Sequence, residues 1–190
     1  MPSPSPSDAP AVRILLISGS LREKSTNTAG LRSAAQLAPD GITTAICDCL
    51  AALPHFNPDD DHEPAPATVA QLRAAVHDAD ALLFSVPEYA GALPGSLKNL
   101  LDWLIGDAEP GSIYEKPVAW LNVSTRGAPN AHAELRTVLG FAHATIVEDA
   151  CVHVPVTEAA IDADGLVTDP DTRAAIRAAL TTLAGAVAAT

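Results

Sequence analysis

The segment Arg13-Ile14-Leu15-Leu16-Ile17-Ser18, followed by Gly19-Ser20, sets the frame for the rest of the chain. Its short apolar run is typical of a strand buried on both faces, as in a parallel sheet that is covered by helices. A helix is expected soon afterwards, over residues 26–38, and Pro39-Asp40-Gly41 would end it. The pattern therefore predicts a buried strand, a polar loop and a helix in direct succession.

The same alternation continues along the chain. Further strands are predicted at residues 42–47, 81–86, 118–123 and 145–152, and further helices at residues 68–79, 95–105, 130–141 and 170–189, with Thr68 as an N-cap. Alternating strands and helices indicate a parallel sheet with helices on both faces. We predict an α/β fold, a flavodoxin-like three-layer sandwich with a five-stranded parallel sheet in order 2-1-3-4-5. A Rossmann half with extra strands is the alternative.

The length of 190 residues suits one domain with a full hydrophobic core. Residues 1–10 (MPSPSPSDAP) lack the basic start and apolar middle of a secretory signal, so we predict a disordered Pro/Ser tail there. Residues 11–190 are then the single domain. No apolar run approaches the roughly 20 residues that span a bilayer, and no membrane partner is expected.

The formal net charge of −12 argues against a nucleic-acid partner, because a groove for phosphates needs clustered Lys and Arg. It does not exclude a small anionic ligand, since a nest of backbone N–H groups can hold a phosphate on an acidic protein.

The cysteines and histidines show no metal-ligand spacing, so no metal site is expected. Cys47, Cys49 and Cys151 also lack a Cys-x-x-Cys pair, and we interpret them as buried reduced thiols of a cytoplasmic protein. His77, which stands beside Asp78, is interpreted as part of a solvated helix end.

The loop of residues 19–28 is rich in groups that bind phosphate. Its donors are the hydroxyls of Ser20, Ser25, Thr26 and Thr28, the amide of Asn27 and the guanidinium of Arg22. The following helix adds free N–H groups and the positive end of its dipole. The loop matches neither Gly-x-Gly-x-x-Gly nor an ordinary P-loop. A phosphate site for a nucleotide-type cofactor competes here with a simple helix cap.

Two more unusual loops follow strands, at residues 87–94 and 124–129. In open α/β sheets, ligands bind beyond the carboxyl ends of the strands, where all three loops are expected to meet. The second loop holds two prolines, and its backbone amides suit the edge of a flat heterocycle. A rigid connector is the alternative interpretation.

Several motifs together resemble one family. Gly19-Ser-x-Arg-x-x-Ser-x-Asn27, Pro87-Glu-Tyr89 and Pro94-Gly-x-Leu-Lys-Asn-x-x-Asp-Trp103 are similar to those of the NADPH-dependent FMN reductases, which include bacterial quinone, chromate and azo-dye reductases. Leu53-Pro-x-Phe-Asn-x-Asp59 and Lys116-Pro-Val118 also resemble the family. The similarity runs over residues 12–152. It implies a flavodoxin-like fold.

The resemblance also implies a set of cofactor-binding residues and no catalytic side chain. The FMN phosphate would be bound by Ser20, Arg22, Ser25, Asn27 and Thr28; the isoalloxazine would be lined by Pro87, Glu88, Tyr89, Ala90 and Gly91; and Ser124, Thr125, Arg126 and Gly127 would contact the ring or ribityl. The family usually has Asn where this chain has Ala90, so only the backbone N–H remains there.

The function implied is an FMN-dependent oxidoreductase that moves a hydride from NADPH or NADH through FMN to a quinone, an azo compound, a metal oxyanion or free flavin, by a ping-pong mechanism. A flavodoxin-like electron carrier and a scaffold that has lost FMN are the alternatives. The resemblance further implies a homodimer or homotetramer. Trp103 is expected at the interface, with a place in the core as the alternative.

Overall fold

The computed structural model describes residues 11–188, and the predicted tail at residues 1–10 lies outside them. The strands are β1 Val12–Ser18, β2 Ile42–Cys47, β3 Ala81–Ser85, β4 Pro117–Asn122, β5 Thr145–Ile146 and β6 Val152–His153. The helices are α1 Thr26–Leu37, α2 Ala67–Asp78, α3 Gly95–Ile105, α4 Pro129–Phe141 and α5 Pro170–Val187. Most predicted elements are present and differ by one or two residues at their ends.

The parallel sheet has the order β2-β1-β3-β4-β5, which confirms the flavodoxin-like prediction over the Rossmann alternative. The predicted single strand at residues 145–152 is wrong, however. Two short strands replace it, β5 pairing with Pro117 and Val118, and β6 pairing with Leu121 and Asn122. Between them Glu148–Ala150 forms a 3₁₀ turn, because the Glu-Asp pair has little strand propensity.

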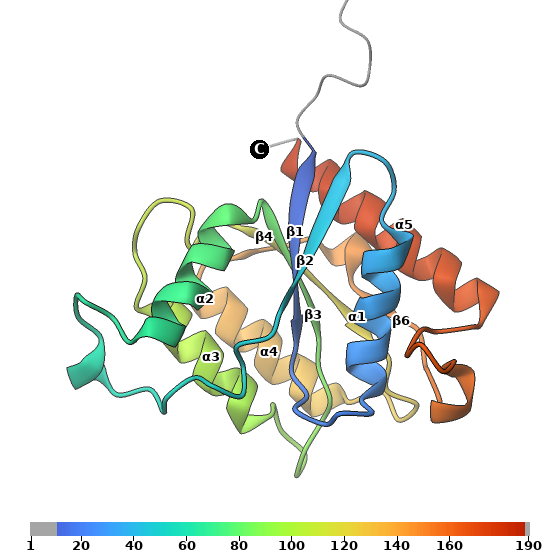
Figure 1. Ribbon diagram of the computed structural model, residues 1–190, viewed down its shortest axis with the longest axis horizontal. Helices are drawn as coiled ribbons and strands as arrows, with labels where there is room; N and C mark the ends of the chain where they lie inside the picture. The colour runs from blue at the N-terminus through green and yellow to red at the C-terminus, as the bar shows by residue number, and fades with distance from the viewer. Residues whose placement is uncertain (1–10, 189–190) are drawn as a thin grey trace, which may run out of the picture.

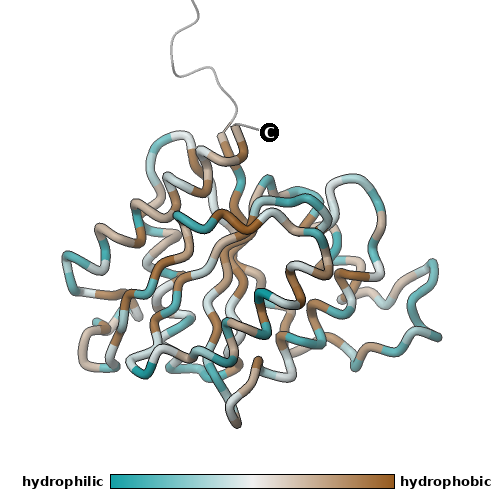
Figure 2. The backbone as a smooth tube through the Cα atoms, turned by 180° about the vertical axis from the view of Figure 1, so that it is seen from behind, coloured by the Kyte–Doolittle hydropathy of each residue, from teal (hydrophilic) through white to brown (hydrophobic). Residues whose placement is uncertain are grey.

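Helices cover both faces of the sheet, with α1 and α5 on one side and α2, α3 and α4 on the other (Figure 1). The position of β1 between the two helix layers explains why its sequence is an unbroken apolar run. Ile14 and Leu16 pack into the α1/α5 layer, whereas Leu15 and Ile17 pack into the opposite layer, and each is at most 3% exposed. The most apolar backbone is accordingly gathered in the central strands (Figure 2).

Local packing corrects three further predictions. Pro66, not Thr68, is the N-cap of α2. Trp103 is fully buried in the core, where its Nε1–H donates to the Pro54 carbonyl over 2.9 Å, so it presents no surface to a partner chain. His77 is not a solvated helix end, because its Nε2 lies 2.7 Å from the Oδ2 of buried Asp107.

Candidate functional site

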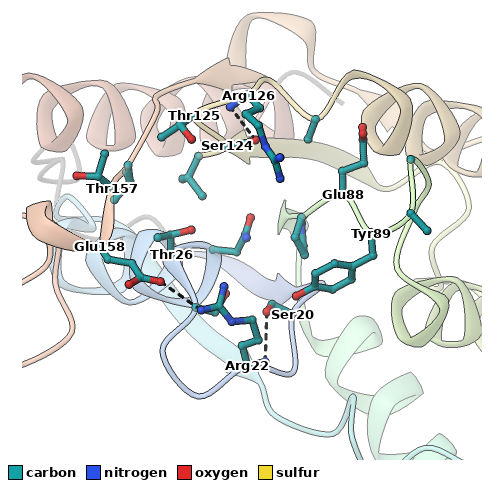
Figure 3. Close-up of a pocket in the computed structure, with 18 residues that line it drawn as sticks. Ser20, Arg22, Thr26, Glu88, Tyr89, Ser124, Thr125, Arg126, Thr157 and Glu158 are labelled. Atoms are coloured by element: carbon teal, nitrogen blue, oxygen red, sulfur yellow. Dashed lines mark hydrogen bonds and ion pairs between the residues drawn. The ribbon is translucent and has the colours of Figure 1, made fainter.

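A cavity of about 700 Å³ opens at the carboxyl ends of β1, β3 and β4, where the three predicted loops meet (Figure 3). A fourth segment, residues 156–158, closes one side. The cavity is lined by Ser20, Arg22, Ser25, Thr26, Asn27, Pro87, Glu88, Tyr89, Ala90, Gly91, Val123, Ser124, Thr125, Arg126, Ala128, Val156, Thr157 and Glu158.

The first loop turns tightly at Gly19, next to the second loop. A Cβ added at Gly19 would lie 3.3 Å from Pro87 and 3.0 Å from Leu97, so a larger residue would force these side chains to shift by a few tenths of an ångström. The loop is then held by hydroxyls, since Ser18 Oγ is 3.0 Å from Thr28 Oγ1. The Arg22 N–H donates to Ser20 Oγ over 3.3 Å.

Helix α1 points its amino end at the cavity. Ser25 is the N-cap, and its Oγ accepts the Thr28 N–H. The N–H groups of Thr26 and Asn27, in the first turn, have no acceptor within the helix. Because they lie at the positive end of the helix dipole, the arrangement suits an anionic group. The Oδ1 of buried Asn27 lies 3.0 Å from the Ser85 hydroxyl, which orients the amide.

The second loop is a two-residue hairpin. Tyr89 and Ala92 exchange backbone hydrogen bonds of 3.2 and 3.0 Å. Ala90 and Gly91 occupy its tip with positive φ angles of 51° and 72°. A type I′ turn requires positive φ at both central positions and favours Asn-Gly there. Ala90 adopts this left-handed conformation without the Asn that such turns favour.

Glu88 connects the second loop to α4. Its Oε2 accepts the N–H groups of Asn130 and Ala131, at 2.9 and 3.2 Å, and so caps the amino end of that helix. The carboxylate is thereby held at one wall of the cavity (Figure 3). Glu88 therefore fixes the second loop relative to the third loop, which leads into α4.

The third loop is shaped by Asn122, which the sequence analysis did not single out. The Asn122 Nδ2 donates to the Gly127 carbonyl over 2.6 Å, and its Oδ1 accepts the Ser124 N–H over 3.1 Å. This clamp leaves the side chain of Arg126 pointing into the cavity, opposite Arg22 (Figure 3). Asn122 ends strand β4, and a polar residue at a strand end was the available signal.

His132 also holds the third loop in place. Its Nδ1–H donates to the carbonyl of Ala128 over 2.8 Å, while its Nε2 is buried with no hydrogen-bond partner in the described part of the chain. Burial lowers the pKa of this imidazole, which favours the neutral form. Ala128 itself has a left-handed backbone, with φ 43°.

The structure gathers most of the predicted site residues but not all of them. Thr28 and Gly127 do not line the cavity, since Thr28 is bonded to Ser18 and Gly127 to Asn122. Val156, Thr157 and Glu158 line it without having been predicted. They follow β6, and the sequence analysis gave them no role.

No group of three or more His, Cys, Asp and Glu residues is arranged to hold a metal ion in residues 11–188. Within the same range, no helix is long and apolar enough to cross a membrane.

The fold and this cavity define an α/β protein with an anion-binding cavity at the carboxyl edge of its sheet. The comparisons are more specific. The family model for NADPH-dependent FMN reductases matches residues 12–159. The chain therefore belongs to the NADPH-dependent FMN reductase family, a family of flavin-dependent oxidoreductases, and the recognition from sequence motifs is confirmed.

Similarity to known proteins extends over nearly the whole chain. An NAD(P)H-dependent FMN reductase of Pseudomonas aeruginosa is 34% identical over 90% of this chain and 93% of its own. A 2-hydroxy-1,4-benzoquinone reductase of a Burkholderia species is 30% identical, over 86% and 89%. The solved structure of the NAD(P)H:acceptor oxidoreductase FerB from Paracoccus denitrificans superposes with a TM-score of 0.81 at 26% identity, over 94% and 98%.

Proposed function

We propose that this protein is an FMN-dependent NAD(P)H oxidoreductase that reduces a small-molecule acceptor: a quinone, an azo compound, a metal oxyanion or free flavin. The observation that carries the proposal is a single cavity with an anion-binding helix end on one side and two backbone-rich loops on the other. When bound, FMN would supply the redox chemistry, by taking a hydride from NAD(P)H and passing two electrons on.

The amino end of α1 carries the hydrogen-bond donors that a phosphate needs. The Ser20 and Ser25 hydroxyls are buried at the cavity wall, and the first-turn N–H groups lie beside them. Arg22 supplies the one positive side chain of this loop that lines the cavity. A phosphate here would accept several charge-assisted hydrogen bonds, each of which contributes about 1.5–3 kcal/mol.

The opposite side fits the flat ring. In the hairpin, the N–H groups of Tyr89 and Ala92 are used within the turn, so those of Ala90 and Gly91 remain for a ligand edge. Ala90 lines the cavity even though it lacks an Asn side chain. This supports an intact ring site and argues against a scaffold that has lost FMN.

Arg126 would stabilise negative charge that develops at this side of the cavity, because its guanidinium points inward and has no carboxylate partner in the described residues (Figure 3). No acid, base or nucleophile is needed for hydride transfer, so the protein's task is to bind, orient and shield. We propose that the nicotinamide and the acceptor occupy the same opening in turn, which is a ping-pong scheme.

The test uses purified full-length protein saturated with FMN. We expect a yellow protein that oxidises NADPH or NADH when a benzoquinone is added, with parallel double-reciprocal plots. Protein that neither binds FMN nor oxidises NAD(P)H would contradict the proposal. Rapid FMN binding with slow reduction by NAD(P)H in stopped-flow would instead favour an electron carrier.

We further propose that the protein works in the cytoplasm as a homodimer or homotetramer. Phe141, at the end of α4, is 71% exposed and lies with Ile105 along a shallow apolar groove beside α3, which supports self-association there. Sedimentation velocity of the wild type and of Phe141→Glu tests this, and a monomeric wild type would refute it.

A further inference from the structure

Cys47 and Cys49 form a close pair outside the cofactor cavity. Cys47 is the last residue of the edge strand β2 and pairs with Ile17 of β1. Cys49 begins a turn in which its carbonyl accepts the Ala52 N–H over 2.9 Å. Their Sγ atoms are 3.2 Å apart, and both residues are partly exposed rather than buried as the sequence suggested.

The pairing follows from the backbone. Residues two apart on an extended chain point to the same side, so the two side chains meet as β2 ends. A disulfide needs its sulfur atoms about 2.05 Å apart. From 3.2 Å, the sulfurs need to approach by only about 1 Å.

The two thiols are not equivalent. The pKa of Cys47 is lowered, chiefly because the Cys49 thiol donates a hydrogen bond to it and also because the Cys49 N–H does so. The pKa of Cys49 is raised by the same contact, by burial and by the charge of Cys47. One sulfur is therefore prepared to attack as a thiolate while the other keeps its proton.

We propose that Cys47 and Cys49 are a dithiol site for thiol–disulfide exchange with low-molecular-weight disulfides, closing into an intramolecular disulfide. The Cys47 thiolate attacks one sulfur of the small disulfide, forms a mixed disulfide and releases one thiolate. Cys49 then loses its proton and attacks the Cys47 sulfur, which releases the second thiol. Two protein thiols are oxidised, one small disulfide is reduced to two thiols, and no other oxidant is needed.

The order of attack is consistent with the contacts. Once Cys47 is in the mixed disulfide it carries no negative charge, so part of the cause that raises the Cys49 pKa disappears. Cys49 thus becomes a better nucleophile at the stage where it must attack.

Cys151 provides a comparison, within the same chain, for the reactivity of Cys47. It is also partly exposed, but its Sγ contacts the Val147 carbonyl at 3.5 Å, and burial raises its pKa to about 11. The pKa of Cys47 is lowered while that of Cys151 is raised, so Cys47 has the larger thiolate fraction, and lower intrinsic nucleophilicity offsets part of this advantage. We expect Cys47 to react at least about tenfold faster than Cys151.

The experiment incubates full-length protein with glutathione disulfide and without NAD(P)H, followed by alkylation and peptide mass spectrometry. We expect the wild type to lose two hydrogens in the peptide that carries residues 47 and 49, with Cys151 free. Cys49→Ser should stop at a glutathione adduct on Cys47, and Cys47→Ser should react at least tenfold more slowly. Cys151→Ser is the matched control and should behave like the wild type.

Preferential modification of Cys151, or no linkage between Cys47 and Cys49 in the wild type, would overturn the proposal. The wild-type measurement alone decides this even if a variant folds poorly. The result does not depend on the proposed oxidoreductase function, because neither NAD(P)H nor bound flavin takes part in the exchange.

Discussion

The guanidinium of Arg22 lies 3.2 Å from the carboxylate of Glu158, and both side chains line the cofactor cavity (Figure 3). They come from segments 136 positions apart in the chain. Glu158 thus already pairs with Arg22, the positively charged side chain that we expect to bind the FMN phosphate. A phosphate must share or displace this partner in order to bind Arg22.

We therefore expect Glu158→Gln to strengthen FMN binding. Both side chains are well exposed, at 62% and 72%, and an exposed ion pair contributes at most about 1 kcal/mol. The expected change is a two- to fivefold lower Kd for FMN at low ionic strength, measured by flavin fluorescence quenching. Asp40→Asn removes the same charge from an exposed site outside the cavity, and it should leave the Kd unchanged.

If Asp40→Asn improves FMN binding as much as Glu158→Gln does, overall charge and not the Arg22 contact is responsible. If Glu158→Gln weakens binding, Glu158 helps to hold the cofactor and the competition is wrong.

Ser25→Ala tests the phosphate end of the cavity. The change removes a buried hydroxyl at the cavity wall together with the N-cap of α1. We expect a Kd for FMN about tenfold higher, from one lost charge-assisted hydrogen bond, and a free energy of unfolding about 1 kcal/mol lower. Isothermal titration and urea unfolding measure the two effects.

Asp169→Ala is the matched control for Ser25→Ala. Asp169 caps α5 by accepting the Thr172 N–H over 2.8 Å, and it does not line the cavity. Asp169→Ala should lower the free energy of unfolding by a similar amount without changing the Kd for FMN. An equal loss of FMN affinity in both variants would mean that Ser25 acts only through helix stability.

The hairpin tip predicts a stabilising substitution. Ala90 has a φ of 51°, in the left-handed region where a non-glycine residue costs roughly 1–2 kcal/mol. Asn tolerates this region better and is favoured in type I′ turns, so Ala90→Asn should raise the free energy of unfolding by about 0.5–1 kcal/mol. Ala92→Asn, at the other side of the same hairpin, should give no such gain. Equal midpoints for Ala90→Asn and the wild type in urea would contradict the turn assignment.

The sequence was sufficient for the sheet order and for the three loops at its carboxyl edge, because apolar runs and the polar residues after them are local features. It was not sufficient for Glu158, which meets Arg22 from 136 positions away in the chain. It also misplaced Trp103, since burial of that side chain depends on the contact with Pro54, 49 positions away. Thr28 has the right chemistry for phosphate, yet its hydroxyl is bonded to Ser18.

His132 predicts a pH dependence of stability. Burial holds its pKa below the value of 6.5 that an unfolded chain has, with His153 acting in the same direction and Ala128 and Glu88 against it. The native state then binds fewer protons than the unfolded state between the two pKa values. The stabilisation is therefore complete above about pH 6.5 and is lost as pH falls through the native pKa. Protonation would also place an Nε2–H in a buried position where the described residues offer no acceptor.

We expect His132→Gln to have a shallower decline of unfolding free energy below pH 6.5 than the wild type has, measured by urea unfolding at a series of pH values. Gln keeps an amide hydrogen-bond donor at this position but has no group that titrates in this pH range. His55→Gln removes an exposed histidine and should leave the wild-type slope unchanged. If His132→Gln and the wild type decline in parallel, the buried imidazole is not the group that titrates, and the acid sensitivity must come from carboxylates elsewhere in the fold.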